Sequence, residues 1–164
     1  MDKHSILKQY YGHSAFRPGQ EALIDAILSG RDALCVMPTG GGKSLCYQIP
    51  ALLLPGITLV VSPLISLMKD QVAALKSAGV PAAYINSSLT SEQIRTVYAR
   101  TRKGAYKLIY VTPERLETNS FLSLMQEMDV SFLAVDEAHC ISQWGQDFRP
   151  SYLGIADFVN ALPR

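Results

Sequence analysis

The chain has 164 residues, the length of a single domain. Hydrophobic residues make up 48% and charged residues 18%, a balance that excludes intrinsic disorder and supports a buried core. Lys and Arg number 15 against 14 Asp and Glu, so the net charge is +1. A globally basic surface is therefore excluded, and any nucleic acid would have to bind in a local groove.

The three cysteines, Cys35, Cys46 and Cys140, are scattered and odd in number, which argues against a disulfide framework or a zinc site. No secretory leader is visible, and no segment reaches about 18 consecutive apolar residues. We therefore expect a soluble protein of a reducing cytoplasm that makes no membrane contact. The absence of repeats and linker-like stretches predicts one compact unit over residues 1–164.

The first two elements expected along the chain are a short apolar stripe and a helix. The stripe covers residues 6–11 and ends at Gly12. Pro18 is then expected to open a helix at its favoured first position, and Gly30 to close that helix after an apolar stripe over residues 23–28.

Short apolar runs then recur, and they are typical of strands that are covered on both faces of a parallel sheet. These runs cover residues 33–36, 57–61, 108–111 and 132–135, with a weaker one over 80–85. Helical patterns lie over residues 45–54 and 64–79, after a capping box at Thr90 and Gln93, and at Tyr152, Ile155, Phe158 and Val159. The alternation predicts an α/β fold, a mostly parallel sheet with helices on both faces.

Four of the predicted strands run directly into clusters of small, polar or charged residues. These clusters cover residues 39–44, 62–63, 112–115 and 136–139. Because ligands of open parallel sheets bind outside the carboxyl ends of the strands, we expect the functional site at that edge.

The first cluster has the composition of a phosphate-binding loop. Consecutive glycine amides can surround an anion at the start of a helix, a lysine can reach the β- and γ-phosphates, and a serine hydroxyl can bind Mg²⁺. The candidate residues are Thr39, Gly40, Gly41, Gly42, Lys43 and Ser44. Met37 stands where the strict pattern requires glycine, and the alternative is a glycine-rich turn with an incidental lysine.

The last cluster, Asp-Glu-Ala-His over residues 136–139, ends a predicted strand. Asp136 would hold Mg²⁺, and Glu137 would orient or deprotonate the attacking water. His139 would sense the γ-phosphate. A solvated acidic strand end is the alternative.

Together these motifs resemble superfamily 2 helicases and, within them, the RecQ family of DNA helicases. The matching segments are residues 16–20, 37–44, 62–68, 112–115 and 136–150. The resemblance accounts for Met37, and it implies that residues 1–164 form the first RecA-like motor domain of a 3′–5′ helicase. Such a protein hydrolyses ATP with Mg²⁺ to move along single-stranded DNA and unwind duplexes during repair and recombination, here in the bacterial cytoplasm or nucleoid.

The resemblance also implies that Gln20 recognises adenine, with Arg17 nearby. A glutamine amide can pair with adenine N6 and N7 at once, which would favour ATP over GTP. The family usually has a stacking tyrosine where this chain has His13, so His13 either stacks on the base or is an exposed loop residue.

An aromatic-rich loop after the acidic cluster would couple DNA binding to ATP hydrolysis, because bases stack on aromatic rings irrespective of sequence. Its candidate residues are Gln143, Trp144, Phe148 and Arg149. The alternative is that Trp144 and Phe148 belong to the core.

Two further clusters are expected to begin helices, with Ser62 and Thr112 as capping residues and Pro63 and Pro113 at the first helical position. Free backbone amides at such helix starts can bind DNA phosphates. Asn86 and Ser87 match the family's phosphate contacts more loosely. Ordinary capping remains the alternative for all of them.

The resemblance implies a second motor domain with an arginine finger, and zinc-binding and winged-helix regions, none of which lies in these 164 residues. We therefore expect the fragment alone to be nearly inactive, zinc to belong only to the missing part, and single-stranded DNA and duplex junctions to be the partners of the whole protein. Two other classes remain open, a small P-loop kinase and a nucleotide-gated binding module without turnover.

Overall fold

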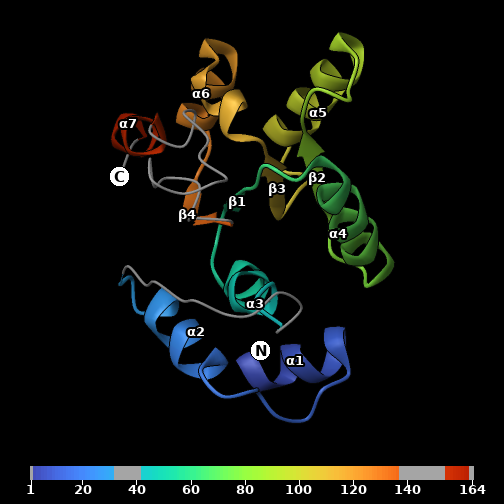
Figure 1. Cartoon of the computed structure of the whole chain (residues 1–164), viewed down its shortest axis with the longest axis vertical. Coiled ribbons are helices and arrows are strands. Elements are labelled where there is room, and N and C mark those ends of the chain that lie inside the picture. The colour runs from blue at the N-terminus through green and yellow to red at the C-terminus, as the bar shows by residue number, and fades with distance from the viewer. Residues whose placement is uncertain (1, 32–41, 137–153, 163–164) are drawn as a thin grey trace, which may run out of the picture. The chain divides into compact units, whose positions relative to one another are not determined.

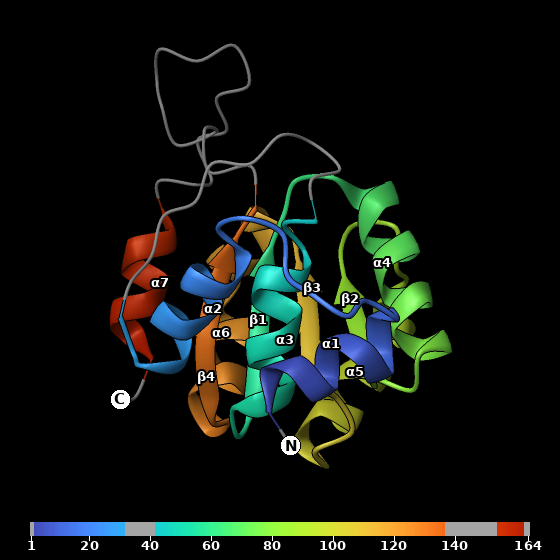
Figure 2. The same ribbon diagram turned by 90° about the horizontal axis from the view of Figure 1, so that it is seen from below.

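The computed structural model describes residues 2–31, 42–136 and 154–162 (Figures 1 and 2). The chain divides into two compact units, Met1–Pro55 and Gly56–Arg164. The predicted strand over residues 33–36 lies outside the described residues. No helix in the described part is both long and apolar enough to cross a membrane.

In the first unit, helix α3 packs against two others. The helices are α1 (Lys3–Tyr11), α2 (Gln20–Leu28) and α3 (Leu45–Leu53). Their apolar faces meet around a core of Ile6, Leu7, Ile24 and Ile49. The Tyr11 hydroxyl donates a hydrogen bond of 2.6 Å to Oε1 of the buried Gln48, which ties the end of α1 to α3.

The end of α1 agrees with the prediction, because Gly12 follows its last residue with a left-handed φ of 71°, but the helix starts at Lys3, before the apolar stripe. The Asp2 carboxylate accepts a hydrogen bond from the Ser5 amide at 2.8 Å, and this bond lowers the pKa of Asp2. The prediction for α2 was wrong at its start, because the helix begins at Gln20 and not at Pro18. Gly19 takes a left-handed φ of 86°, so it cannot be part of a right-handed helix begun by Pro18.

The second unit contains a parallel sheet with the strand order β2-β3-β1-β4. The strands are β1 (Ile57–Val61), β2 (Ala82–Ile85), β3 (Leu108–Val111) and β4 (Val130–Val135). Burial of β1 and β3 along their whole length explains their continuous apolar runs. The predicted α/β fold with a mostly parallel sheet is confirmed.

The order of the strands decides which face each connecting helix covers. The elements are α4 (Ile65–Ser77), α5 (Ser91–Arg102), the 3₁₀ helix η1 (Pro113–Glu117), α6 (Asn119–Glu127) and α7 (Ile155–Ala161). The chain moves from β1 to β2 through α4 and returns to β3 through α5. Because such crossovers are right-handed, this reversal places α4 on one face of the sheet and α5 and α6 on the other (Figure 1).

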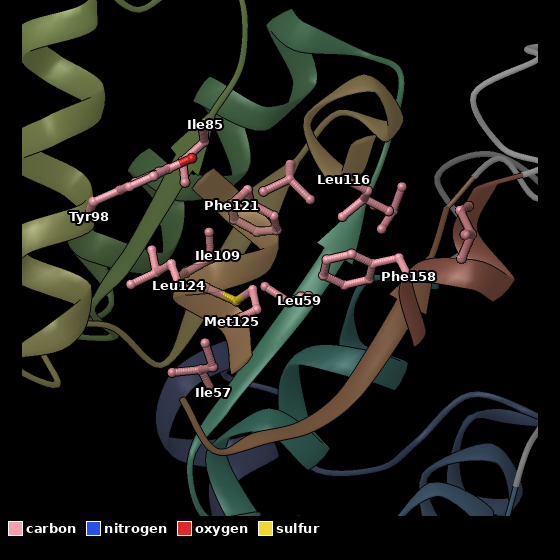
Figure 3. Packing of buried hydrophobic residues seen from close by; sticks show 13 residues of the cluster. Ile57, Leu59, Ile85, Tyr98, Ile109, Leu116, Phe121, Leu124, Met125 and Phe158 are labelled. Carbon is pink, nitrogen blue, oxygen red and sulfur yellow. The ribbon is translucent and has the colours of Figure 1, made fainter. Parts of the chain in front are cut away.

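The larger core of this unit lies between the sheet and helices α5, α6 and α7 (Figure 3). Phe121 of α6 stacks on Phe158 of α7 with a ring separation of 5.9 Å, and Tyr98 of α5 lies 6.3 Å from Phe121. Helix α6 was not predicted from the sequence. The predicted capping box of α5 is confirmed, since the Gln93 amide donates to Thr90 Oγ1 and Gln93 Oε1 accepts from the Thr90 amide.

Candidate functional site

A pocket of about 140 Å³ lies within the first unit. It brings together candidate residues from the loop before α2, from α2 and from the residues that precede α3. The predicted site residues that line it are His13, Arg17, Gln20 and Gly42, and Leu7 and Leu45 add apolar walls. This volume, which described residues alone enclose, is below the roughly 300–1,000 Å³ typical of sites for drug-sized ligands.

Gln20 is the polar centre of this pocket, and its exposed fraction is 1%. Its Oε1 accepts a hydrogen bond of 2.8 Å from the Arg17 amide, and its Nε2 donates one of 3.0 Å to the Gly42 carbonyl. A primary amide has two N–H donors and two acceptor lone pairs. Among the residues that the structure describes, these two bonds leave Gln20 one further donor and one further acceptor, the pair that an adenine edge requires.

Gly42 lies close to Gln20 and has a backbone conformation that favours glycine. Its φ is 79°, and a Cβ atom would lie 2.6 Å from Gln20 Nε2, at the far end of that side chain. A larger residue would therefore strain the backbone and displace the Gln20 amide. The Gly42 carbonyl also accepts a hydrogen bond from the Leu45 amide, so the start of α3 is held beside Gln20.

Lys43 and Ser44 follow Gly42 and are half-buried, and helix α3 begins at the next residue. Ser44 occupies the position before the helix, yet its hydroxyl makes no capping hydrogen bond. This hydroxyl is a hard oxygen donor of the kind that Mg²⁺ prefers, so Ser44 fits the predicted metal.

The second unit aligns four predicted residues at the carboxyl ends of its strands. In the order of the sheet, these residues are Asn86, Thr112, Ser62 and Asp136. The register pairs Val61 with both Val111 and Val135, so the strands end level. The Asp136 amide donates a hydrogen bond of 2.8 Å to the Val61 carbonyl, which holds the acidic strand end beside β1. Three of the four predicted clusters, which begin at Ser62, Thr112 and Asp136, thus start at this edge, whereas the cluster over residues 39–44 belongs to the first unit.

The structure corrects the capping roles of two of these residues. Helix α4 begins at Ile65, so Ser62 is not its cap and Pro63 is not its first residue. The Ser62 hydroxyl instead accepts a hydrogen bond of 3.2 Å from the Leu64 amide. Thr112 does precede η1, with proline at the first helical position, but its hydroxyl makes no capping bond.

Asn86 is fully buried and shapes its own loop. Its Oδ1 accepts hydrogen bonds from the amide and hydroxyl of Ser88, and its Nδ2 points to Met68 Sδ at 3.6 Å. The Ser87 side chain is exposed, whereas those of Ser62 and Thr112 are buried. Among these residues, only the Ser87 side chain and the backbone amides are therefore placed to contact phosphates at this edge.

The DEAD/DEAH box helicase family matches residues 17–163, which is most of the chain. This chain belongs to the DEAD/DEAH box helicase family. Within the family, it is 55% identical to the ATP-dependent DNA helicase RecQ of Haemophilus influenzae over 97% of its own length, and 55% identical to RecQ of Bacillus subtilis over 92%. The resemblance to RecQ helicases is confirmed. The chain spans 26% of the length of each of these two relatives.

A solved structure has a similar fold. A hypothetical ATP-dependent RNA helicase from Sulfolobus tokodaii superposes with a TM-score of 0.66, covering 96% of this chain and 44% of that one. Its sequence identity of 20% supports the fold alone.

Several site residues predicted for this helicase domain lie outside the described residues. They are Thr39, Gly40, Gly41, Glu137, His139, Gln143, Trp144, Phe148 and Arg149. Among the residues that are described, no group of three or more His, Cys, Asp or Glu side chains could hold a metal ion. Sequence reasoning missed the apolar pocket walls at Leu7 and Leu45, whose only signal was their place in helical stripes.

Proposed function

We propose that residues 1–164 form the ATP-binding first motor domain of a 3′–5′ DNA helicase that acts in repair and recombination in the bacterial cytoplasm. The names of the RecQ relatives at 55% identity support DNA as the substrate of the whole protein. The observation that carries the nucleotide assignment is Gln20, a buried amide that lines a pocket beside Gly42 and keeps a donor and an acceptor for a base.

In this proposal the base enters the pocket of the first unit, where Gln20 pairs with adenine and His13 and Arg17 lie at the pocket wall. The amides of residues 39–42 and the Lys43 ammonium bind the phosphates. Magnesium would neutralise charge on the triphosphate, and Ser44 and Asp136 are its proposed ligands. Glu137 would orient or deprotonate the attacking water, and His139 would respond to the γ-phosphate.

Single-stranded DNA, at junctions with duplex, is the proposed partner of the whole protein. The proposed DNA contacts at the strand ends are the exposed Ser87 side chain and the backbone around Ser62, Pro63, Asn86 and Thr112. The proposed contacts after the acidic cluster are Gln143, Trp144, Phe148 and Arg149. Since the resemblance places an arginine finger on a second motor domain, we expect the 164 residues alone to hydrolyse ATP slowly. Stimulation of hydrolysis by single-stranded DNA in the full-length protein would separate this function from that of a P-loop kinase.

Replacing Gln20 with alanine should reduce the preference for ATP over GTP by about 10- to 100-fold, because a bidentate amide–adenine pair is worth about 1–3 kcal/mol of discrimination. The measurement is equilibrium binding of ATP and GTP with Mg²⁺ to the 164-residue chain.

Inorganic triphosphate has no base, so its affinity for the same variant measures whether loss of the hydrogen bond to the Gly42 carbonyl disturbs phosphate binding. Gln9→Ala on the exposed face of α1 is the matched control and should leave the affinities for ATP and for GTP unchanged. Undiminished discrimination by Gln20→Ala would remove Gln20 from base recognition.

A further inference from the structure

The outward face of α5 carries an unpaired basic surface. Within the described part of the chain, the side chains of Arg95, Arg100 and Lys103 are exposed and make no hydrogen bond or ion pair. Arg102 is different, because its Nε donates to Glu127 Oε2 at 3.1 Å. The only acid on α5 is Glu92, in the first turn. We call Arg95, Arg100 and Lys103 the α5 basic face.

Helix-end electrostatics explains only part of this composition. Cations in the last turn complement the partial negative charge at the end of a helix, which accounts for Arg100 and Arg102. Arg95 lies in the first half of the helix, where this effect gives a cation no advantage. Arg95, Ala99 and Lys103 follow one another at intervals of four residues and therefore form one row along the helix.

The row is long enough to lie along several phosphates of a nucleic-acid backbone. Arg95 and Lys103 are eight residues apart, or about 12 Å along the helix axis. One strand of a DNA duplex carries a negative charge about every 3.4 Å of axis, so the row spans about three to four phosphates. Ala99 and Thr96 are small and exposed, so they leave room for a backbone to approach between the cations.

The chemistry of the α5 basic face favours duplex over single-stranded DNA. Surfaces for single strands combine charge with aromatic side chains on which bases stack. No exposed residue of α5 is aromatic, and the only ring of the helix, Tyr98, is buried against Phe121. A face that offers cations without stacking partners can read only phosphates, and a duplex presents phosphates with its bases turned inward.

The direction of α5 places this face next to the strand ends of its own unit. Strands β2 and β3 are parallel and joined by α5, so α5 runs antiparallel to them. The helix therefore begins at the carboxyl edge, beside the Asn86–Ser88 loop, and its basic end leads to the opposite edge. A DNA molecule that reaches Ser87 can continue along α5.

From these observations we propose that the α5 basic face binds the phosphate backbone of duplex DNA adjoining the single strand. This inference rests on the proposed function in one respect, since a DNA-unwinding motor works where a duplex meets a single strand. It assigns a second DNA-contact surface, separate from the strand ends.

The test compares two triple variants of the 164-residue chain that lose the same net charge. The first is Arg95→Gln, Arg100→Gln and Lys103→Gln. The control changes the exposed Lys8, Lys69 and Lys76 of α1 and α4 to glutamine. Binding of a blunt DNA duplex of about two helical turns, and of one of its single strands, is measured by fluorescence anisotropy between about 50 and 200 mM salt.

We expect the first variant to bind the duplex more weakly and to reduce the slope of log affinity against log salt by about 3, because about 0.9 counterions are released per phosphate contact. The control should change the slope by less than about 1. Single-strand binding should fall less than duplex binding.

Three results would overturn the inference: no measurable duplex binding by the unchanged chain, equal losses in the two triple variants, or equal losses for duplex and single strand. Polyglutamate that competes with duplex for the unchanged chain, but not for the first variant, would assign the face to an acidic protein instead. ATP affinity of the first variant should be unchanged. If the unchanged chain does not bind ATP, the proposed function is refuted, but the measured difference in duplex binding between the two triple variants still tests the α5 basic face.

Discussion

Replacing Gly56 with alanine should destabilise the chain by about 4 kcal/mol or more, the range reached by severe steric substitutions. Gly56 has a φ of 71°, and a Cβ atom there would overlap the Asp129 carbonyl oxygen and lie 2.9 Å from Asp129 Cγ. That carbonyl accepts the Ile57 amide at 2.8 Å, at the start of the β1–β4 pairing. The oxygen therefore cannot move away without breaking the sheet at its amino edge.

Two other glycines separate this clash from backbone strain. Gly79 and Gly104 have φ values of 88° and 77°, and a Cβ atom at either would meet nothing within 4 Å. Alanine at these positions should cost only about 1–2 kcal/mol, the penalty of the left-handed conformation. Urea unfolding with a shared m-value measures all three variants. Equal losses at Gly56 and Gly104 would show that the Asp129 contact has no effect.

Replacing Lys43 with alanine should weaken ATP binding by about 10- to 100-fold, since hydrogen bonds to charged groups contribute about 1.5–3 kcal/mol. Lys43 directly follows Gly42, whose carbonyl is held by Gln20 and by the amide of the first residue of α3. The backbone of Lys43 is thus held next to the pocket that Gln20 and Gly42 line.

Equilibrium binding of an ATP analogue in the presence of Mg²⁺ measures the effect of the Lys43 substitution. Lys8→Ala, an exposed lysine of the same unit, controls for the loss of one positive charge. Lys43→Arg should retain more affinity than Lys43→Ala because it keeps the charge. Unchanged affinity in Lys43→Ala would refute its role at the phosphates.

The strands were predictable because burial on both faces leaves a signal in the sequence itself. Ile57–Val61 and Leu108–Val111 agree with the prediction to the residue, since every side chain in them is buried. Helix α6 was missed although Phe121, Leu124 and Met125 form an apolar row at helical spacing. No side-chain cap marks its start after Thr118.

Helix starts and loop contacts were harder to predict because several local hydrogen bonds compete for the same side chain. Ser62 bonds to the Leu64 amide and α4 starts later, which the Ser-Pro pair alone does not reveal. Asn86 has the composition of an exposed turn residue, yet packing against Met68 buries it completely. In the base pocket, the pairing of Gln20 with Gly42 joins residues 22 positions apart, and no periodicity encodes such a contact.

Gln20 is hydrogen-bonded to both the Arg17 amide and the Gly42 carbonyl, and these two bonds limit how its nucleotide preference could be changed by mutation. A substitution at Gln20 made to accommodate guanine would also remove a brace from the backbone that precedes Lys43. A variant that prefers GTP would thus need a second substitution that supplies a new hydrogen-bond donor to the Gly42 carbonyl.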